Sequence, residues 1–257
     1  MRTIAFVTQK GGSGKSTIAS SVAVAAHEAG ERVFVLDMDP LASLVKWAKE
    51  RGDADIPVEA VTADKLKKVL AALEKDGITL VVIDTPGADD GAVAAAKVAN
   101  LSVIPARPNA FDLWASDKTR AAIKRLGREY VFLLNQCPPA QQSLRVQNGA
   151  KALEAMGGLL TPLIASRVDF QEAARFGLGV TEFNPSGGAA ADMRSLWLSI
   201  KRRLARDAKA GAGKTVAVGK ASAKAGASKA PADEGVERPN LDQPSMDQPA
   251  AAEQRAA

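Results

Sequence analysis

Short apolar runs alternate with longer amphipathic stretches over most of the chain. The runs have the length and the β-branched content of strands that are buried on both faces of a sheet. They cover 3–8, 32–37, 56–61, 78–84, 101–105, 130–135 and 159–164. The stretches with helical spacing cover 16–29, 41–51, 64–75, 89–99, 112–127, 142–156 and 187–206. This alternation predicts an α/β fold, in which a mainly parallel, doubly wound sheet is flanked by helices.

The alternating pattern stops near residue 206, where the composition changes. Residues 208–230 are mostly Lys, Ala, Gly and Ser, and residues 231–257 are rich in Pro, Gln, Ala and acidic side chains. Neither stretch has enough apolar surface to offset the entropy of ordering it. We therefore predict one domain over 1–206 and a disordered tail over 207–257.

The composition excludes several classes of protein. Cys137 is the single cysteine, which excludes an intramolecular disulfide and a cysteine-cluster metal site. No transmembrane helix is expected, because no run of about 18 uncharged apolar residues occurs. The first predicted strand starts at the N-terminus, so no signal peptide is expected and the prediction is a cytoplasmic protein. The net charge of +5 and the pI of about 9.3 are compatible with a polyanionic partner such as DNA.

A glycine-rich stretch, KGGSGKST at 10–17, stands between the first predicted strand and the first predicted helix. Strand, glycine loop and helix in this order form a phosphate cradle, because backbone N–H groups and the helix N-terminus both attract an anion. Lys15 would supply a full charge to the β- and γ-phosphates, and the Ser16 hydroxyl would bind Mg²⁺. The predicted nucleotide-binding residues of the loop are Gly11, Gly12, Ser13, Gly14, Lys15, Ser16 and Thr17.

The loop departs from the common motif G-x-x-x-x-G-K-[ST] at one position. Gln9 stands where that motif has its first glycine. At every fixed position the loop matches an altered motif, K-G-G-x-G-K-[ST], in which Lys10 precedes the glycines. Because Lys10 lies before the cradle, it cannot easily serve the phosphates that Lys15 binds.

Three other predicted strands end in polar residues, which would meet the loop where parallel strands end. Asp37 and Asp39 follow the second strand, Asp84 ends the fourth, and Asn135 ends the sixth. An aspartate at a strand end is usually a turn or cap residue, but the combination with the loop assigns Asp39 and Asp84 to the site. We expect Asp84 to hold Mg²⁺ through its water shell, and Asn135 to read an adenine edge.

These motifs together resemble the ParA/MinD family of deviant Walker ATPases. The resemblance rests on the loop with its leading lysine, on Asp-Met-Asp-Pro at 37–40 and on Asp-Thr-Pro-Gly at 84–87, and it extends from residue 1 to about 204. Within the family, the run Pro-Ala-Arg-Pro-Asn-Ala-Phe-Asp at 105–112 is similar to the short plasmid-partition ParA proteins. The implied fold is that of a P-loop nucleoside triphosphatase with a deviant Walker A loop.

The resemblance implies a homodimer that sandwiches two ATP molecules and hydrolyses them slowly. Lys10 would reach the phosphates of the partner subunit, much as an arginine finger does, while Lys15 would hold the phosphates in its own subunit. Asp39 would orient the attacking water, and Thr17 would lie near the α-phosphate. The predicted catalytic residues are Lys10, Lys15 and Asp39, and the predicted metal-site residues are Ser16, Asp39 and Asp84.

The resemblance also implies partners. In the family, the ATP-bound dimer binds non-specific DNA, and a ParB-like or other activating protein stimulates hydrolysis. A nucleoid-associated ATPase would then partition or position a plasmid, a chromosome or a protein cargo. Non-specific DNA binding needs basic side chains on phosphates. The candidates are Arg167, Arg175, Arg194, Lys201, Arg202 and Arg203.

A MinD-like membrane ATPase is the main competing hypothesis. Met193, Leu196, Trp197, Ile200 and Leu204 fall on one face of the last predicted helix, which cations flank. Apolar residues at this spacing more often dock on a core than on a membrane, and a polar tail follows the helix, so a membrane partner is not expected. The sequence is also compatible with a metabolic ligase or small-molecule kinase of the same fold, and with a scaffold that binds nucleotide without hydrolysis.

Overall fold

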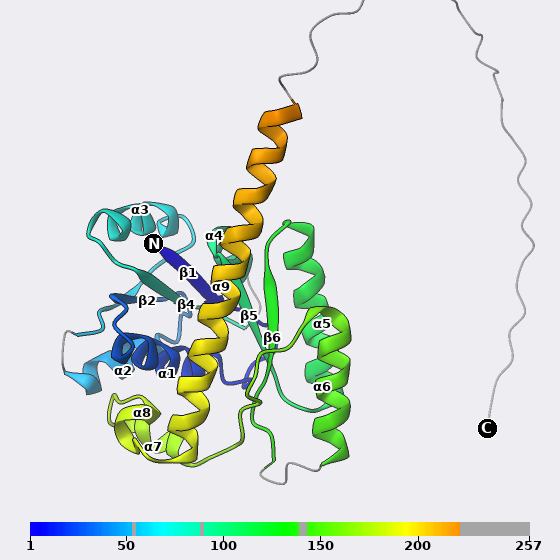
Figure 1. Cartoon of the computed structure of the whole chain (residues 1–257). Helices are drawn as coiled ribbons and strands as arrows, with labels where there is room; N and C mark the ends of the chain where they lie inside the picture. Colours follow the sequence, from blue (N-terminus) through cyan, green and yellow to red (C-terminus); the bar gives the residue numbers. More distant parts are fainter. Residues whose placement is uncertain (53–54, 88–89, 139–142, 222–257) are drawn as a thin grey trace, which may run out of the picture. The chain divides into compact units, whose positions relative to one another are not determined.

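Six parallel strands form one sheet in the part of the chain that the computed structural model describes, residues 1–52, 55–87, 90–138 and 143–221. The strand order is β3-β2-β4-β1-β5-β6 (Figure 1). The strands are β1 (Arg2–Phe6), β2 (Val33–Asp37), β3 (Val58–Ala60), β4 (Leu80–Asp84), β5 (Leu101–Ala106) and β6 (Tyr130–Leu134). The predicted α/β fold with a parallel sheet is confirmed.

The register of the central strands aligns the ends that carry the motifs. Phe6 at the end of β1 pairs with Asp84 at the end of β4, and Asp84 pairs on its other side with Asp37 at the end of β2. All strands run in the same direction, so the residues that follow them gather at one edge, which we call the carboxyl edge. Open α/β sheets bind ligands at this edge.

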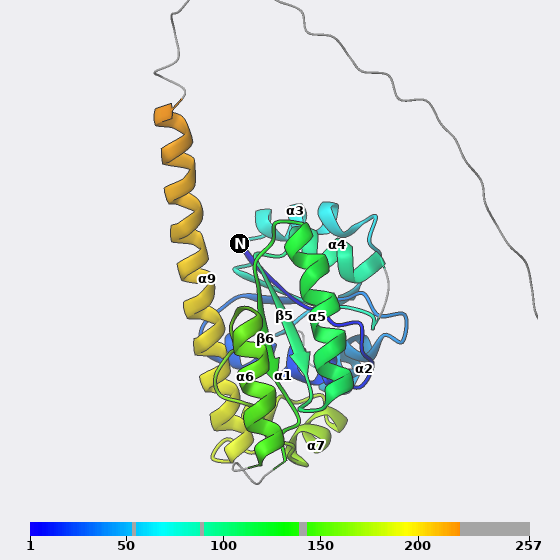
Figure 2. The ribbon, with the colours of Figure 1, turned by 90° about the vertical axis from the view of Figure 1, so that its right-hand side faces the viewer.

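Helices cover both faces of the sheet, because successive residues of each strand point to opposite faces. On one face, alternate strand residues, among them Val33, Val35, Leu80 and Val82, pack against α1, α2, α7, α8 and α9. On the other face, the strand residues between them pack against α3 and α4 or against α5 and α6. Figure 2 shows α9 and α5 on opposite sides of the sheet. The helices are α1 (Lys15–Glu28), α2 (Ser43–Arg51), α3 (Leu66–Lys75), α4 (Asp90–Val98), α5 (Ala110–Arg125), α6 (Leu144–Gly157), α7 (Asp169–Arg175), α8 (Val180–Phe183) and α9 (Gly188–Ala221).

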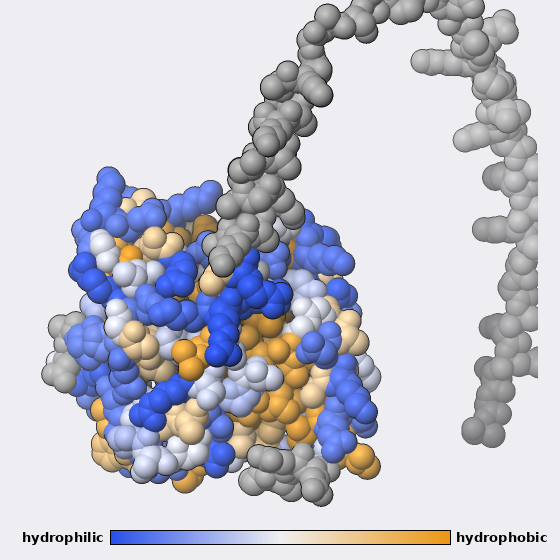
Figure 3. All heavy atoms as spheres, in the orientation of Figure 1, coloured by the Kyte–Doolittle hydropathy of each residue, from blue (hydrophilic) through white to orange (hydrophobic). Residues whose placement is uncertain are grey.

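The segment predicted as a seventh strand, 159–164, runs beside β6 without becoming a regular strand. The backbone N–H of Leu160 donates to the Phe132 carbonyl at 2.8 Å, and that of Ile164 donates to the Leu134 carbonyl at 2.9 Å. Pro162 lies between these bonds and has no N–H, so the ladder is interrupted there. Figure 3 shows that the surface between α9 and α6, where this segment runs, is apolar.

The last helix, α9, uses its apolar face for the core. Met193, Leu196, Trp197, Ile200 and Leu204 are each at most 3% exposed and belong to the cluster that covers the sheet. This face is therefore buried in the core and not available to a membrane. No described helix is both long enough and apolar enough to cross a membrane.

The structure also bears on the predicted domain boundary. Residues 1–214 form one compact unit, and the second unit, 215–257, is described only as far as Ala221, where it is helical. The boundary predicted at residue 206 falls inside α9, which extends to Ala221. Residues 222–257 lie outside the described residues, so the predicted disorder of the tail stays a prediction.

Candidate functional site

The glycine-rich loop connects β1 to α1 at the carboxyl edge. Gly12 and Gly14 have φ angles of 75° and 87°, in the region that glycine adopts without strain. Gly14 is the N-cap of α1, and no side chain caps this helix end. No acidic residue lies in the first turn of α1. The free N–H groups at the start of α1 therefore offer an anion site beside Lys15.

Side chains that follow β6 hold the loop in place. The Asn135 amide donates to the Ser13 carbonyl at 2.8 Å, and the Gln136 amide donates to the Gly12 carbonyl at 3.0 Å. A Cβ on Gly14 would lie 2.4 Å from the Asn135 amide nitrogen, so only glycine fits there. The adenine-reading role of Asn135 stays a prediction, because the contact that the structure gives its amide is with the loop. The sequence motifs assign no role to Gln136.

Asp84 is the most deeply buried polar group of the site. Its side chain is 0% exposed, and its Oδ2 accepts a hydrogen bond of 2.5 Å from the Ser16 hydroxyl. Its Oδ1 has no hydrogen-bond partner within the described residues. Burial raises the pKa of Asp84 to about 7; the nearby Asp37 and Asp39 add to this, while Ser16 and Lys15 oppose it.

Lys15, close to Asp84, is also buried, and burial shifts its pKa in the opposite direction. It is 8% exposed, and burial lowers its pKa, although the carboxylates of Asp84 and Asp39 partly offset the effect. Burial thus disfavours the charged form of both the lysine and Asp84. A site of this kind is completed by ligands that carry charge: an anion for Lys15 and a cation for Asp84.

The oxygen atoms around Asp84 fit a hard cation. The unpartnered Oδ1 of Asp84 and the hydroxyl of Ser16 are the donor type that Mg²⁺ prefers. No group of three or more His, Cys, Asp or Glu side chains suited to a metal ion occurs among the residues described. Mg²⁺ usually binds through one or two protein groups together with phosphate and water, so the residues present fit a metal that arrives with a nucleotide.

Asp37 fixes the turn that carries Asp39. The Asp37 side chain is 2% exposed, and its Oδ2 accepts the N–H groups of Leu44 and Val45 at 2.9 and 3.2 Å. Its Oδ1 accepts the N–H of Asp39 at 3.0 Å. Asp39 is half-buried and accepts the N–H of Leu41 at 2.9 Å. Sequence reasoning assigned Asp39 and missed the anchoring role of Asp37, which a buried carboxylate shortly before a helix could have signalled.

Lys10 is half-buried at the outer start of the loop. Its backbone N–H donates to the Thr8 hydroxyl at 3.3 Å. No hydrogen bond or ion pair of its ammonium group is found in the part of the chain that the structure describes, so the group is placed to meet a charge from outside it.

A cavity of about 150 Å³ opens beside the loop. It lies between the start of α1 and the segment 165–171, which leads into α7. Asn135 and Gln136 contribute amides to its wall and Phe170 contributes a ring. Apolar and amide groups together suit a nucleotide base. The lining residues are Gly14, Thr17, Ile18, Asn135, Gln136, Ala165, Ser166, Arg167, Phe170 and Gln171.

The structure separates the predicted DNA-contacting residues. Arg167 lines the cavity beside the loop and pairs with Asp192 at 3.3 Å. Lys201 pairs with Glu31 at 3.0 Å, and Arg203 with Glu129 at 3.4 Å. Both glutamates stand just before strands, so this second group lies at the edge opposite the nucleotide loop.

The other three candidates differ in exposure and in partners. Arg175 pairs with Glu172 and is 70% exposed. Arg194 donates to the carbonyls of Pro185 and Thr181. Arg202 is exposed. Their role in DNA binding stays a prediction.

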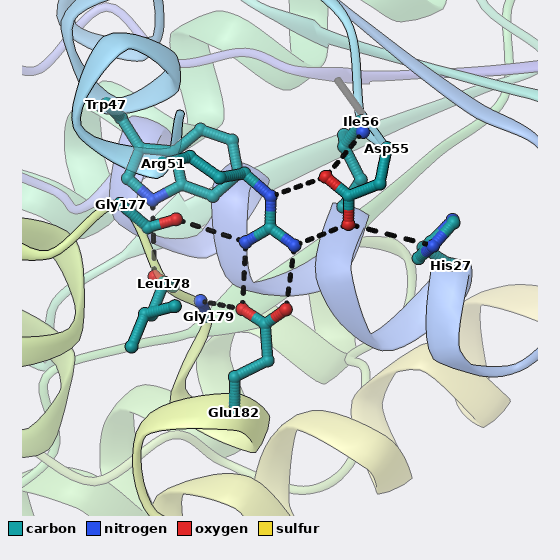
Figure 4. Close-up of polar contacts among 9 residues, drawn as sticks. All are labelled: His27, Trp47, Arg51, Asp55, Ile56, Gly177, Leu178, Gly179 and Glu182. Carbon is teal, nitrogen blue, oxygen red and sulfur yellow. Dashed lines mark hydrogen bonds and ion pairs between the residues drawn. The ribbon is translucent and has the colours of Figure 1, made fainter. Parts of the chain in front are cut away.

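A second polar cluster holds the far end of α2 (Figure 4). The guanidinium of Arg51 makes five hydrogen bonds, two with Asp55, two with Glu182 and one with the Gly177 carbonyl, at 2.6 to 3.1 Å. These bonds use all five of its N–H donors. Trp47 supports the cluster by donating to the Leu178 carbonyl at 3.2 Å. We call Arg51, Asp55 and Glu182 the arginine cluster.

Comparison with known proteins agrees with this site. Residues 4–178 match the CobQ/CobB/MinD/ParA nucleotide binding domain. The maintenance of carboxysome distribution protein A of Gloeobacter kilaueensis is 32% identical over 217 residues, which are 80% of this chain and 95% of that protein. The protein ParA of Rhizobium radiobacter is 28% identical over 69% of this chain and 84% of its own length. The structure of the septum site-determining protein MinD with Mg-ADP from Pyrococcus horikoshii superimposes with a TM-score of 0.63 at 19% identity, over 80% of this chain and 98% of that one.

Proposed function

Because this chain belongs to the CobQ/CobB/MinD/ParA nucleotide-binding family and is an ATPase of the ParA/MinD type, we propose that it uses slow ATP hydrolysis to position a cargo inside the cell. The observation that carries the proposal is Lys10, which begins the phosphate loop and whose ammonium group makes no hydrogen bond or ion pair within the described residues. A half-site of this kind is completed by a second copy of the chain, so ATP would control dimerisation.

The side chains of the loop would bind the nucleotide. The N–H groups at the start of α1 and the ammonium of Lys15 would hold the phosphates, and the cavity beside Asn135 would take the base. Ser16 and Asp84 would hold Mg²⁺, which neutralises charge on the phosphates when it is bound. Binding would relieve the cost of burying Lys15 and Asp84.

Asp39 would orient the attacking water. Asp37 supports this role, because it fixes both the Asp39 backbone and the first turn of α2. The ammonium of Lys10 would approach the phosphates of the partner subunit, where a cation stabilises the charge of phosphoryl transfer. Hydrolysis would remove the group that Lys10 contacts, so the dimer would separate.

We infer the cargo, and the surface on which the protein moves it, from the relatives. One relative is named for carboxysome distribution and another is a ParA protein, so the cargo would be a protein assembly or a plasmid. A ParB-like or other activating protein would stimulate hydrolysis, and the ATP-bound dimer would use non-specific DNA in the nucleoid as its surface. Arg167 and Arg175 line cavities that the start of α1 also lines, so they are better placed for this than Lys201 and Arg203, which lie at the opposite edge.

The proposal is tested with Asp39→Ala, which should slow hydrolysis and keep the dimer assembled. With Mg-ATP we expect a dimer by size-exclusion chromatography with light scattering, and with Mg-ADP a monomer. Lys10→Ala should abolish the dimer, while Lys49→Ala, on an exposed position of α2, should not. The ATP-bound protein should also shift non-specific DNA in a gel. Binding only to lipid vesicles would favour a MinD-like membrane ATPase, and a monomer under all conditions would refute the sandwich.

A further inference from the structure

Arg107 lies beside the phosphate loop, although the motifs of the sequence assign it no role. It stands between the end of β5 and the start of α5. Its Nη1 atom is 3.7 Å from the position that a Cβ on Gly12 would occupy. The guanidinium thus reaches the loop from a different strand than Lys15 does.

A buried carboxylate fixes the direction of the Arg107 side chain. Asp112 is 1% exposed; its Oδ2 accepts Nε of Arg107 at 2.8 Å, and its Oδ1 accepts Nη2 at 3.1 Å. Asp112 also accepts the backbone N–H of Arg107 at 3.1 Å. Asn109 in turn caps α5 by accepting the N–H of Asp112 at 3.0 Å. The fork occupies Nε and Nη2 and leaves Nη1 on the side of Gly12.

This arrangement prepares one guanidinium edge for an anion. An arginine that is already held by a carboxylate loses little further side-chain entropy when it binds a phosphate oxygen. The side chain is 32% exposed, so a ligand can reach it. Its pKa is raised by the hydrogen bonds to Asp112, so the charge is permanent.

We propose that Arg107 binds the terminal phosphate of a nucleoside triphosphate at the carboxyl edge, through Nη1, and so distinguishes ATP from ADP. Lys15 is the first residue of α1, whereas Arg107 approaches the loop at Gly12, which precedes the N-cap Gly14. A contact at Gly12 would therefore reach a phosphate farther from the start of α1, which is the phosphate that hydrolysis removes.

The triphosphate has two possible sources, the loop of the same subunit or the loop of a partner subunit. Contact with the loop of the same subunit requires only the ATPase. Contact across subunits rests on the dimer of the proposed function. The chemistry is the same in both cases, and the experiment separates them by protein concentration.

The test compares two nucleotides on three variants by isothermal titration calorimetry with Mg²⁺. Arg107→Gln should weaken the binding of a non-hydrolysable ATP analogue by roughly tenfold or more, since it removes a charged hydrogen bond. The binding of ADP should stay within about twofold. Arg107→Lys should recover part of the preference. Arg120→Gln, which removes a half-buried partner of Asp117 on the same helix, should change neither affinity.

Equal weakening of both nucleotides would show that Arg107 only supports the loop, and it would overturn the proposal. Unchanged affinities for both nucleotides in Arg107→Gln would also overturn it. Circular dichroism would verify that the variants are folded. If the preference is lost in dilute, monomeric protein, the contact lies within one subunit. If it is lost only where light scattering shows a dimer, the contact crosses subunits. A protein that never dimerises would refute the sandwich and leave the first arm of this test intact.

Discussion

The two ends of α2 carry polar clusters of opposite character. At its C-terminal end, the arginine cluster pairs one guanidinium with two carboxylates and satisfies every N–H donor of Arg51. At its N-terminal end lie the phosphate loop and Asp84, which we call the nucleotide edge. Here Oδ1 of Asp84 and Oγ of Ser13 have no partners in the described chain. Buried polar groups in folded proteins are normally paired. The comparison teaches that one cluster is built to hold the fold and the other to receive a ligand.

The pKa shifts separate the two clusters in the same way. Hydrogen bonds with Arg51 hold the pKa of Asp55 below its usual value, and those with Asp55 and Glu182 raise the pKa of Arg51. Each partner thus favours the charged form of the other. At the nucleotide edge, burial shifts the pKa values of Asp84 and Lys15 toward neutrality. Charge is stabilised in the arginine cluster and penalised at the nucleotide edge, until a ligand arrives.

The largest expected effect comes from breaking the arginine cluster. Arg51→Met leaves Asp55 and Glu182 without their cation, and we expect the free energy of unfolding to fall by about 3 kcal/mol, at the lower end of the range for a buried pair because both carboxylates are partly exposed. The measurement is urea unfolding without nucleotide. Arg175→Met is the matched control, because it removes an exposed ion pair with Glu172 and should cost less than about 1 kcal/mol. Similar losses for the two variants would contradict the comparison.

At the nucleotide edge, removing the charge of Asp84 should raise the stability of the nucleotide-free protein. The folded pKa of Asp84 lies near 7, above its unfolded value of about 4. Between these values the folded state keeps a proton that the unfolded state has lost, so the stability of the nucleotide-free protein should fall as pH rises. We expect Asp84→Asn to remove this part of the pH dependence, which amounts to about 2 kcal/mol between pH 5 and pH 7.

The measurement is the unfolding free energy of both proteins in EDTA from pH 5 to pH 8. Asp84→Asn should match the parent protein near pH 5 and exceed it in stability near pH 8. The same variant should lose Mg²⁺-dependent nucleotide binding. A variant that is less stable than the parent at pH 8 would show that Asp84 is a structural group, as Asp55 is.

The two clusters also differ in how far the sequence could predict them. The nucleotide edge was predictable because its groups lie in short local motifs at strand ends, and the parallel sheet brings strand ends together. The arginine cluster was not, because Arg51 and Glu182 are 131 residues apart and no sequence pattern connects them. The short helices α7 and α8, with seven and four residues, are too brief to show helical periodicity.

Three other features were not predicted: the irregular seventh strand, the position of Arg107 and the hydrogen bonds that hold the loop. Pro162 within the predicted seventh strand was a visible signal against a regular strand. Arg107 stands in a run that the sequence did single out, but only the structure shows its guanidinium beside Gly12. The two hydrogen bonds that hold the loop from Asn135 and Gln136 likewise depend on side-chain directions that a sequence pattern does not contain.

The smallest expected effect concerns Gln136, which is exposed and donates to the loop carbonyl of Gly12. Gln136→Ala should weaken the binding of Mg-ADP by about tenfold or less, since it removes one neutral hydrogen bond that shapes the loop. The unfolding free energy should stay within about 0.5 kcal/mol, as for other surface changes. Asn135→Ala is the comparison, because the buried Asn135 amide holds the Ser13 carbonyl and its loss should cost about 1–3 kcal/mol of stability. If Gln136→Ala destabilised the fold as much as Asn135→Ala, the contact at Gly12 would stabilise the fold itself. The part of the loop at Gly12 would then resemble the arginine cluster more than a ligand-binding group.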